Sequence, residues 1–227
     1  MATVGPDDQP KRVGSTYRGA AAETYFDYQR SLGELGGRLD RHKFERELRP
    51  TDVLVDFGCG AGALLQQLSA RAKIGIEVSD VARRAATERG LRTVSSSAEI
   101  DAESVDAVIS NHALEHALRP LDELRGLHRI LRRGGKLVLW LPLDDWRMQR
   151  RAGADPNHHL YTWTPQLLHN LLVEAGFEVC ACRVVPHAWP PFSERLSTLP
   201  RPLFDALATL WAVLRRQRQL MAVATRP

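Results

Sequence analysis

The chain has 227 residues, of which 44% are hydrophobic and 26% are charged, as in ordinary soluble globular domains. It contains no run of about eighteen apolar residues, which a membrane span requires, and residues 1–14 (MATVGPDDQPKRVG) lack the apolar core of a signal peptide. Its three cysteines are too few for a disulfide framework and form no CxxC unit. We therefore expect a cytoplasmic protein with a single domain and no membrane contact.

The net charge of +4 is mildly basic, which raises the question of nucleic-acid binding. The cations are spread along the chain, and the densest groups (residues 129–133 and 215–218) lie at the ends of predicted helices. Positive charge is favourable there because it opposes the negative end of the helix dipole. Solvated helix ends explain these groups, so we expect no nucleic-acid partner.

The first fifty residues divide into two parts. Residues 1–19 are polar and are expected to be flexible. From residue 20 to residue 48, apolar side chains recur every three to five positions, which indicates one or two amphipathic helices. Gly36 and Gly37 are adjacent within this stretch and predict a break between two helices.

From residue 53 onward, short apolar strands alternate with helices. The predicted strands are residues 53–57, 74–78, 92–94, 105–110 and 136–141. A helix follows the first strand (residues 63–72), Ser79 caps the next helix and Gly90 ends it, and Pro120 opens a third that Gly134 and Gly135 close. Strands that are apolar on both faces and alternate with helices are typical of a doubly wound, mostly parallel sheet.

The last third of the chain is less regular. Residues 144–159 are polar and loop-like, Thr164 and Pro165 start a helix through residue 175, and residues 177–185 form a sixth strand. Residues 186–202 hold five prolines and are expected to be irregular. A helix over residues 203–215 and a last strand over residues 219–225 (QLMAVAT) complete the prediction.

A glycine-rich loop joins the first strand to its helix. In VLVDFGCGAGALL (residues 53–65), Gly58, Gly60 and Gly62 let backbone N–H groups approach a ligand closely. Glu77 lies 21 residues after Asp56, where a carboxylate can accept hydrogen bonds from ribose hydroxyls. The looser dinucleotide fingerprint is also satisfied, so an NAD or FAD protein is an alternative. The Gly-x-Gly-x-Gly spacing, the acid two residues before it and the run NHALEH (residues 111–116) argue against that alternative.

These motifs resemble the class I S-adenosylmethionine-dependent methyltransferases. The resemblance rests on VDFGCGAG, GIEVSD, DAVISNHALEHALRP and LRRGGKLVLWLP, and it covers most of residues 52–142. It implies a Rossmann-like, doubly wound α/β sheet of seven strands whose last strand, QLMAVAT, is antiparallel. The run HLYTWTP (residues 159–165) is similar to a subgroup that often modifies sugars or other small metabolites.

The resemblance also implies which residues contact the cofactor, S-adenosyl-L-methionine, and its product S-adenosyl-L-homocysteine. Asp56 and the loop of Gly58, Cys59, Gly60 and Gly62 would hold the methionine part. Glu77 would bind the ribose, Val78 would pack on the adenine, and Ser97, Ala98 and Glu99 would reach the adenine amino group. Asn111 and His112 would line the sulfonium pocket, and an N-terminal lid would contribute from Tyr17, Tyr25 and Arg30. A capping role for Asp56 and a packing role for Tyr25 stay open.

Methyl transfer from a sulfonium mainly requires alignment of the acceptor and exclusion of water, and an oxygen acceptor also benefits from a base. His112, His116 and His159 are the candidate catalytic bases, with Glu115 as an orienting carboxylate on the same helical turn as His112 and His116. A divalent-metal site and an inert structural turn are the alternatives for this turn. We expect no metal.

We therefore predict a methyltransferase with flexible residues 1–19, a helical lid over residues 20–50, a cofactor-binding core over residues 51–142 and acceptor-side elements over residues 143–227. The predicted reaction is O-methylation of a small molecule, such as a sugar, a glycan precursor or a secondary metabolite, by a monomer or homodimer. Two alternatives remain: an enzyme of the same fold that catalyses an intramolecular displacement (cyclisation), and a non-catalytic cofactor-binding regulator.

Overall fold

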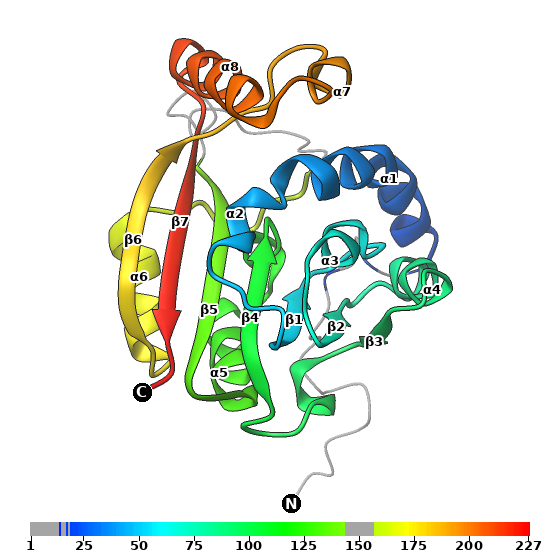
Figure 1. The fold of residues 1–227 in the computed structure, drawn as a ribbon. Coiled ribbons are helices and arrows are strands. Elements are labelled where there is room, and N and C mark those ends of the chain that lie inside the picture. The colour runs from blue at the N-terminus through cyan, green and yellow to red at the C-terminus, as the bar shows by residue number, and fades with distance from the viewer. Residues whose placement is uncertain (1–13, 15–16, 18, 144–156) are drawn as a thin grey trace, which may run out of the picture.

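The computed structural model describes residues 14, 17, 19–143 and 157–227. Within these residues, seven strands form one sheet in the order β3-β2-β1-β4-β5-β7-β6 (Figure 1). The strands are β1 (Val53–Phe57), β2 (Ala72–Ile76), β3 (Arg92–Val94), β4 (Val105–Asn111), β5 (Leu131–Leu143), β6 (Glu178–Pro186) and β7 (Arg218–Thr225). β1 to β5 are parallel, and β7 runs antiparallel to both β5 and β6. The predicted Rossmann-like sheet with an antiparallel last strand is confirmed.

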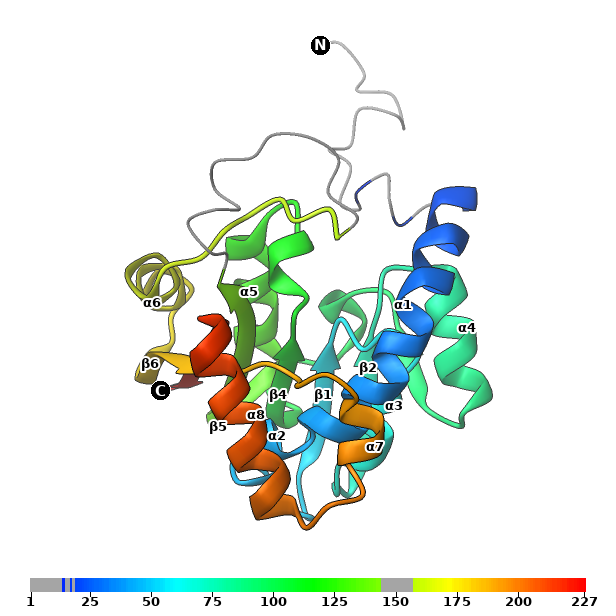
Figure 2. The same ribbon diagram turned by 90° about the horizontal axis from the view of Figure 1, so that it is seen from above.

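Helices cover both faces of the sheet. They are α1 (Gly19–Asp40), α2 (His42–Glu45), α3 (Ala63–Gln67), α4 (Asp80–Glu88), α5 (Pro120–Ile130), α6 (Pro165–Glu174), α7 (Ser193–Leu196) and α8 (Arg201–Arg215), with short 3-10 turns η2 (Ser97–Glu99) and η3 (Leu114–His116). Seen from above, α1, α2, α3, α7 and α8 lie on one side of the sheet, and α5 and α6 lie on the other (Figure 2). None of the helices described is both long and apolar enough to cross a membrane.

Two apolar layers form because successive side chains of a strand point to opposite faces. Leu54 of β1 packs in one layer with α2 and α3, whereas the next residue, Val55, packs in the other layer with α5 and α6. Both side chains are fully buried. The strands therefore read as nearly continuous apolar runs, and their carboxyl ends meet along one edge of the sheet.

The predicted break at Gly36 and Gly37 is wrong, because α1 continues unbroken from Gly19 to Asp40. The glycines serve close packing instead. A Cβ on Gly37 would lie 2.6 Å from the backbone carbon of Ala63 at the start of α3, and one on Gly36 would lie 3.1 Å from the ring of Trp189. Gly37 thus lets α1 lie directly against α3, which follows the glycine loop, and Gly36 leaves room for Trp189.

Several element boundaries differ from the sequence prediction. The helix after the glycine loop ends at Gln67, so β2 starts at Ala72, two residues earlier than predicted. Helix α5 ends at Ile130, and the glycines expected to close it lie inside β5, where the Gly134 N–H donates to the Arg226 carbonyl at 2.7 Å. The proline-rich segment contains the short helix α7, and α8 begins two residues earlier than predicted. Ser79 and Thr164 cap α4 and α6 as predicted.

Candidate active site

The glycine loop is hydrogen-bonded to the last residue of β2. The N–H groups of Gly58 and Cys59 donate to the Ile76 carbonyl at 2.8 and 3.2 Å. Gly58 has a φ of 76°, and a Cβ there would lie 2.2 Å from the Cβ of Ala113, so only glycine fits at this contact between the loop and the segment after β4. Gly60 faces open space, since a Cβ there would meet nothing within 4 Å. The loop backbone is therefore hydrogen-bonded to β2 on one side, and at Gly60 it faces open space.

Glu77 and Asp56, the two acids predicted to contact the cofactor, are both buried next to this loop. Glu77 is 9% exposed and accepts hydrogen bonds from the N–H of Gly60 (3.0 Å) and the N–H of Ser79 (2.8 Å). Asp56 is 2% exposed, and burial, together with the charge of Glu77, raises its pKa to about 7. Burial also raises the pKa of Glu77, although the two backbone donors oppose that shift. The backbone donors fix the orientation of the Glu77 carboxylate at the loop.

The predicted adenine segment forms the short turn η2. Ser97 is buried, and Ala98 is exposed. The carboxylate of Glu99 accepts from the N–H groups of Ser95 and Ser96 in a capping box, which gives this side chain a local structural role. Beside the buried Glu77, the apolar side chain of Val78 is 37% exposed, as expected of a surface on which an aromatic ring could stack.

At the end of β4, Asn111 belongs to a buried polar network that the sequence did not predict. The Lys43 ammonium is fully buried and donates to Asp40 at 2.8 Å, to Gln219 at 2.9 Å and to Asn111 at 3.3 Å. The Asn111 amide in turn donates to Asp40 at 3.1 Å. His112 lies next to this network, and burial and the Lys43 charge lower its pKa to about 3, although a third of its side chain is exposed.

Asp40 is the centre of this network. Besides Lys43 and Asn111, it accepts a hydrogen bond from the indole of Trp189 at 3.0 Å and pairs with His187 at 3.2 Å. Burial acts to raise the pKa of Asp40, but the Lys43 ammonium and His187 hold it well below its usual range. Asp40 is therefore an anion that joins α1 to the segment after β6. The sequence carried no clear signal of this network, because Asp40 and Lys43 lie among other charged residues such as Arg41.

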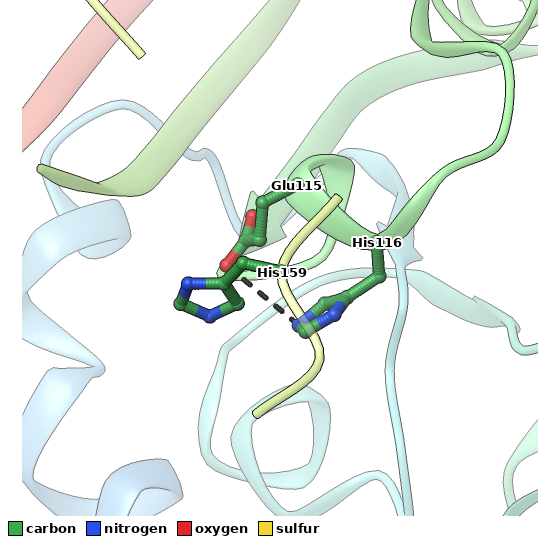
Figure 3. Close-up of side chains that lie close together, drawn as sticks. All are labelled: Glu115, His116 and His159. Carbon is green, nitrogen blue, oxygen red and sulfur yellow. Dashed lines mark ion pairs between the residues drawn. The ribbon is translucent and has the colours of Figure 1, made fainter. Parts of the chain in front are cut away.

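The predicted catalytic residues do come together, as a carboxylate–imidazole cluster of Glu115, His116 and His159 (Figure 3). One ligand atom from each residue can be chosen so that all three lie within 4.8 Å of one another. Glu115 is completely buried, and its Oε1 lies 3.9 Å from His116 Nε2 and 3.8 Å from His112 Nδ1. Figure 3 shows the two imidazoles on the same side of the carboxylate.

Backbone hydrogen bonds explain why His159 reaches η3 from so far along the chain. The N–H groups of Leu160 and Tyr161 donate to the Glu115 carbonyl at 3.0 and 3.3 Å. The Tyr161 hydroxyl donates to the Leu118 carbonyl at 3.2 Å. His116 Nδ1 lies 3.4 Å from the His158 carbonyl. The segment that carries His159 is thus hydrogen-bonded to η3, the turn that carries Glu115 and His116.

The lid residues are only partly described. Tyr17 lies beside the cluster, with its ring centroid 6.0 Å from that of His116 in an edge-to-face arrangement. Tyr25 and Arg30 are on α1, but their side chains lie outside the described part of the structure, as do most of residues 1–19 and the loop over residues 144–156.

A glycine loop after β1, an acid at the end of β2 and polar side chains beyond β4, on a sheet of this topology, define a class I methyltransferase that uses S-adenosylmethionine. Residues 27–181 match the model of a protein family described as a methyltransferase domain, and the chain belongs to that family. The chain therefore contains a methyltransferase domain of the class that uses S-adenosylmethionine, as the sequence predicted.

Known proteins of similar sequence or similar fold include other methyltransferases. The chain is 33% identical over 126 residues to an uncharacterised methyltransferase of Schizosaccharomyces pombe, a match that spans 49% of this chain and about half (48%) of the relative. A chain from the Haloferax volcanii complex between the Trm112 methyltransferase activator and a methyltransferase aligns with a TM-score of 0.68 at 19% identity, over 90% of this chain and 95% of that one. The Haemonchus contortus phosphoethanolamine N-methyltransferase 2, solved with S-adenosylhomocysteine, aligns with a TM-score of 0.58 at 16% identity, over 84% and 52%.

Proposed function

We propose that this enzyme transfers the methyl group to a hydroxyl oxygen of a small molecule, such as a sugar, a glycan precursor or a secondary metabolite. The observation that carries the proposal is the carboxylate–imidazole cluster, which follows β4 directly and adjoins the glycine loop through the contact between Gly58 and Ala113. An attacking hydroxyl must lose its proton, and imidazole is well suited to accept a proton near neutral pH. The similarity of HLYTWTP to enzymes that modify sugars supports the class of acceptor.

In this proposal, residues at the carboxyl ends of β1, β2 and β4 would hold the cofactor. When bound, S-adenosylmethionine supplies a methyl group on an activated sulfonium. The loop of Gly58, Cys59, Gly60 and Gly62 and the carboxyl of Asp56 hold the methionine part, and Glu77 accepts from the ribose hydroxyls. Val78 and residues 97–99 would contact the adenine, and Asn111 would line the sulfonium pocket. Tyr17, Tyr25 and Arg30 belong to the lid that excludes water.

Among the three candidate bases, we assign proton acceptance to His116 or His159. His112 is the weaker base of the set, because its pKa of about 3 leaves little driving force for taking a proton from a hydroxyl. Glu115 orients the imidazole of His116, whose other ring nitrogen faces the His158 carbonyl. His112 then lines the sulfonium pocket as an uncharged side chain and takes no part in proton transfer.

The test is a panel of sugar, phenol, amine and carboxylate acceptors incubated with the enzyme and S-adenosylmethionine, with mass spectrometry of both products. The proposal predicts a methyl ether on a hydroxyl acceptor and an equal amount of S-adenosylhomocysteine. Of His116→Ala and His159→Ala, the variant that removes the base should lower kcat by about 100-fold or more, whereas His169→Ala, at an exposed position of α6, should not. Methylthioadenosine as the product would instead indicate intramolecular displacement, and binding without turnover would indicate a regulator.

The proposal includes a monomer or homodimer that acts in the cytoplasm without a nucleic-acid partner. Light scattering of the purified chain measures the oligomeric state. A mass of one or two chains agrees with the proposal, and a larger assembly contradicts it.

A further inference from the structure

We propose that Glu115, His116 and His159 form a binding site for a first-row divalent transition-metal ion such as Zn²⁺. The inference rests on the proposed function for what the ion does, but its binding can be tested separately. The sequence places Glu115 and His116 next to each other, but only the fold brings His159, 43 residues further along, to the same point (Figure 3).

The chemistry of the ligand set favours such an ion. Two imidazoles and one carboxylate make up the protein ligands of many catalytic zinc sites, which keep a further position open for water or substrate. Hard ions such as Mg²⁺ prefer oxygen ligands, so two nitrogen ligands select against them. The carboxylate of Glu115 is completely buried, so it would offer the ion an oxygen ligand shielded from water.

The geometry is close to what coordination requires. Ligand atoms that each lie about 2.0–2.2 Å from a tetrahedral zinc ion are roughly 3.3–3.6 Å apart. Glu115 Oε1 and His116 Nε2 are 3.9 Å apart, and the three ligand atoms lie within 4.8 Å of one another. Side-chain rotations that close these gaps by on the order of 1 Å are small compared with the freedom of a partly exposed histidine.

A second observation concerns the other ring nitrogen of His116. Nδ1 lies 3.4 Å from the carbonyl oxygen of His158, and because a carbonyl oxygen only accepts, this contact favours the tautomer with a proton on Nδ1 and a lone pair on Nε2. Metal-bound histidines usually donate their second nitrogen to a carbonyl or carboxylate in this way. The backbone bonds from Leu160 and Tyr161 to the Glu115 carbonyl hold His159 at the same place, so the three ligands come from two segments fastened together.

The position of the ion suggests its role. A divalent ion lowers the pKa of a bound hydroxyl or water toward neutrality, as zinc does for water. An acceptor hydroxyl that occupies the open position would lose its proton to solvent. Its oxygen would then form a bond to the methyl carbon while the carbon–sulfur bond breaks and leaves its electron pair on sulfur. In this state the two imidazoles are ligands, and they no longer accept the proton themselves.

The experiment is calorimetric titration of the chelator-treated full chain with Zn²⁺, and visible absorption with Co²⁺. We expect one equivalent bound with micromolar or tighter affinity. His159→Ala should weaken binding at least tenfold, and this residue lies outside the helices and strands, so the variant should fold. His158→Ala is the matched control, because His158 is not one of the three ligands and the variant retains the backbone carbonyl that faces His116.

Three results would overturn the inference. They are absence of Zn²⁺ and Co²⁺ binding by the folded wild-type chain, equal affinity of wild type and His159→Ala, and displacement of Co²⁺ by an equal concentration of Mg²⁺. Binding of S-adenosylhomocysteine to the chelated protein is measured in parallel. If the metal-free protein transfers the methyl group at an undiminished rate, the proposed function stands and the ion has no role in it.

Discussion

Glu77 accepts a hydrogen bond from the backbone N–H of Gly60 at 3.0 Å, so the acid at the end of β2 holds the centre of the glycine loop. The same carboxylate accepts from Ser79, and these two donors leave it with acceptor capacity for a ligand. We propose that Glu77 both shapes the loop and binds the ribose of the cofactor.

Glu77→Ala should weaken binding of S-adenosylhomocysteine by on the order of 1–3 kcal/mol, because charge-assisted hydrogen bonds to the ribose are lost. Isothermal titration calorimetry measures the change. Glu88→Ala, at an exposed position of α4, is the control and should bind as the wild type does. An unchanged affinity in Glu77→Ala would remove this residue from the cofactor site.

The buried carboxyl of Asp56 should make stability depend on pH. Its pKa of about 7 in the folded chain lies above the value of about 3.9 expected for an unfolded chain, so the folded state retains a proton that the unfolded state loses. The resulting stability is fully present below about pH 4 and is lost as the pH rises through about 7.

Asp56→Asn should remove this contribution. Between pH 5 and pH 8, the free energy of unfolding of the cofactor-free wild type should fall by about 2–3 kcal/mol more than that of the variant, as measured by urea denaturation. Asp101→Asn, at an exposed position, should follow the wild-type curve. Parallel curves for the wild type and Asp56→Asn would mean that Asp56 is ionised throughout this range.

The contact between α1 and α3 can be tested at two glycines of one helix. Gly37→Ala would place a methyl group 2.6 Å from the Ala63 backbone, and we expect a loss of about 1–3 kcal/mol in stability together with weaker cofactor binding. Gly33→Ala adds a methyl group in open space on the same helix and should stabilise the chain by up to about 1 kcal/mol. Similar thermal midpoints for the two variants would show that α1 does not pack closely on α3.

The buried pair of Asp40 and Lys43 should be strongly coupled. Lys43→Met leaves Asp40 as a buried anion without its cation and should cost about 3–5 kcal/mol of unfolding free energy. The double variant Asp40→Asn/Lys43→Met should recover part of that loss, because no charge remains uncompensated. Lys136→Met breaks a partly exposed pair with Glu47 and should cost less than about 1 kcal/mol. Equal losses in Lys43→Met and Lys136→Met would contradict the coupling.

The sequence predicted the elements whose signals are local. Ser79, Thr164 and Pro120 mark helix starts where the structure has them, and the strand over residues 92–94 has the predicted bounds. The prediction at Gly36 and Gly37 was wrong because a glycine pair can either end a helix or admit close neighbours. Only the positions of Trp189 and α3 in the fold distinguish the two cases.

Contacts between distant segments could not be predicted in the same way. His187 and Trp189 reach Asp40 from nearly 150 residues further along the chain, through a proline-rich segment without periodicity. His112, Glu115 and His116 were expected together because they lie within one turn. The approach of His159 depends on hydrogen bonds from Leu160 and Tyr161 to the Glu115 carbonyl, which leave no pattern in the sequence.

The most direct test of the account is a crystal structure with bound S-adenosylhomocysteine. We expect the ribose within hydrogen-bonding distance of the Glu77 carboxylate, the adenine against Val78, and the sulfur directed toward Asn111 and the cluster of Glu115, His116 and His159. A ribose away from Glu77, or a sulfur directed away from the end of β4, would contradict the account.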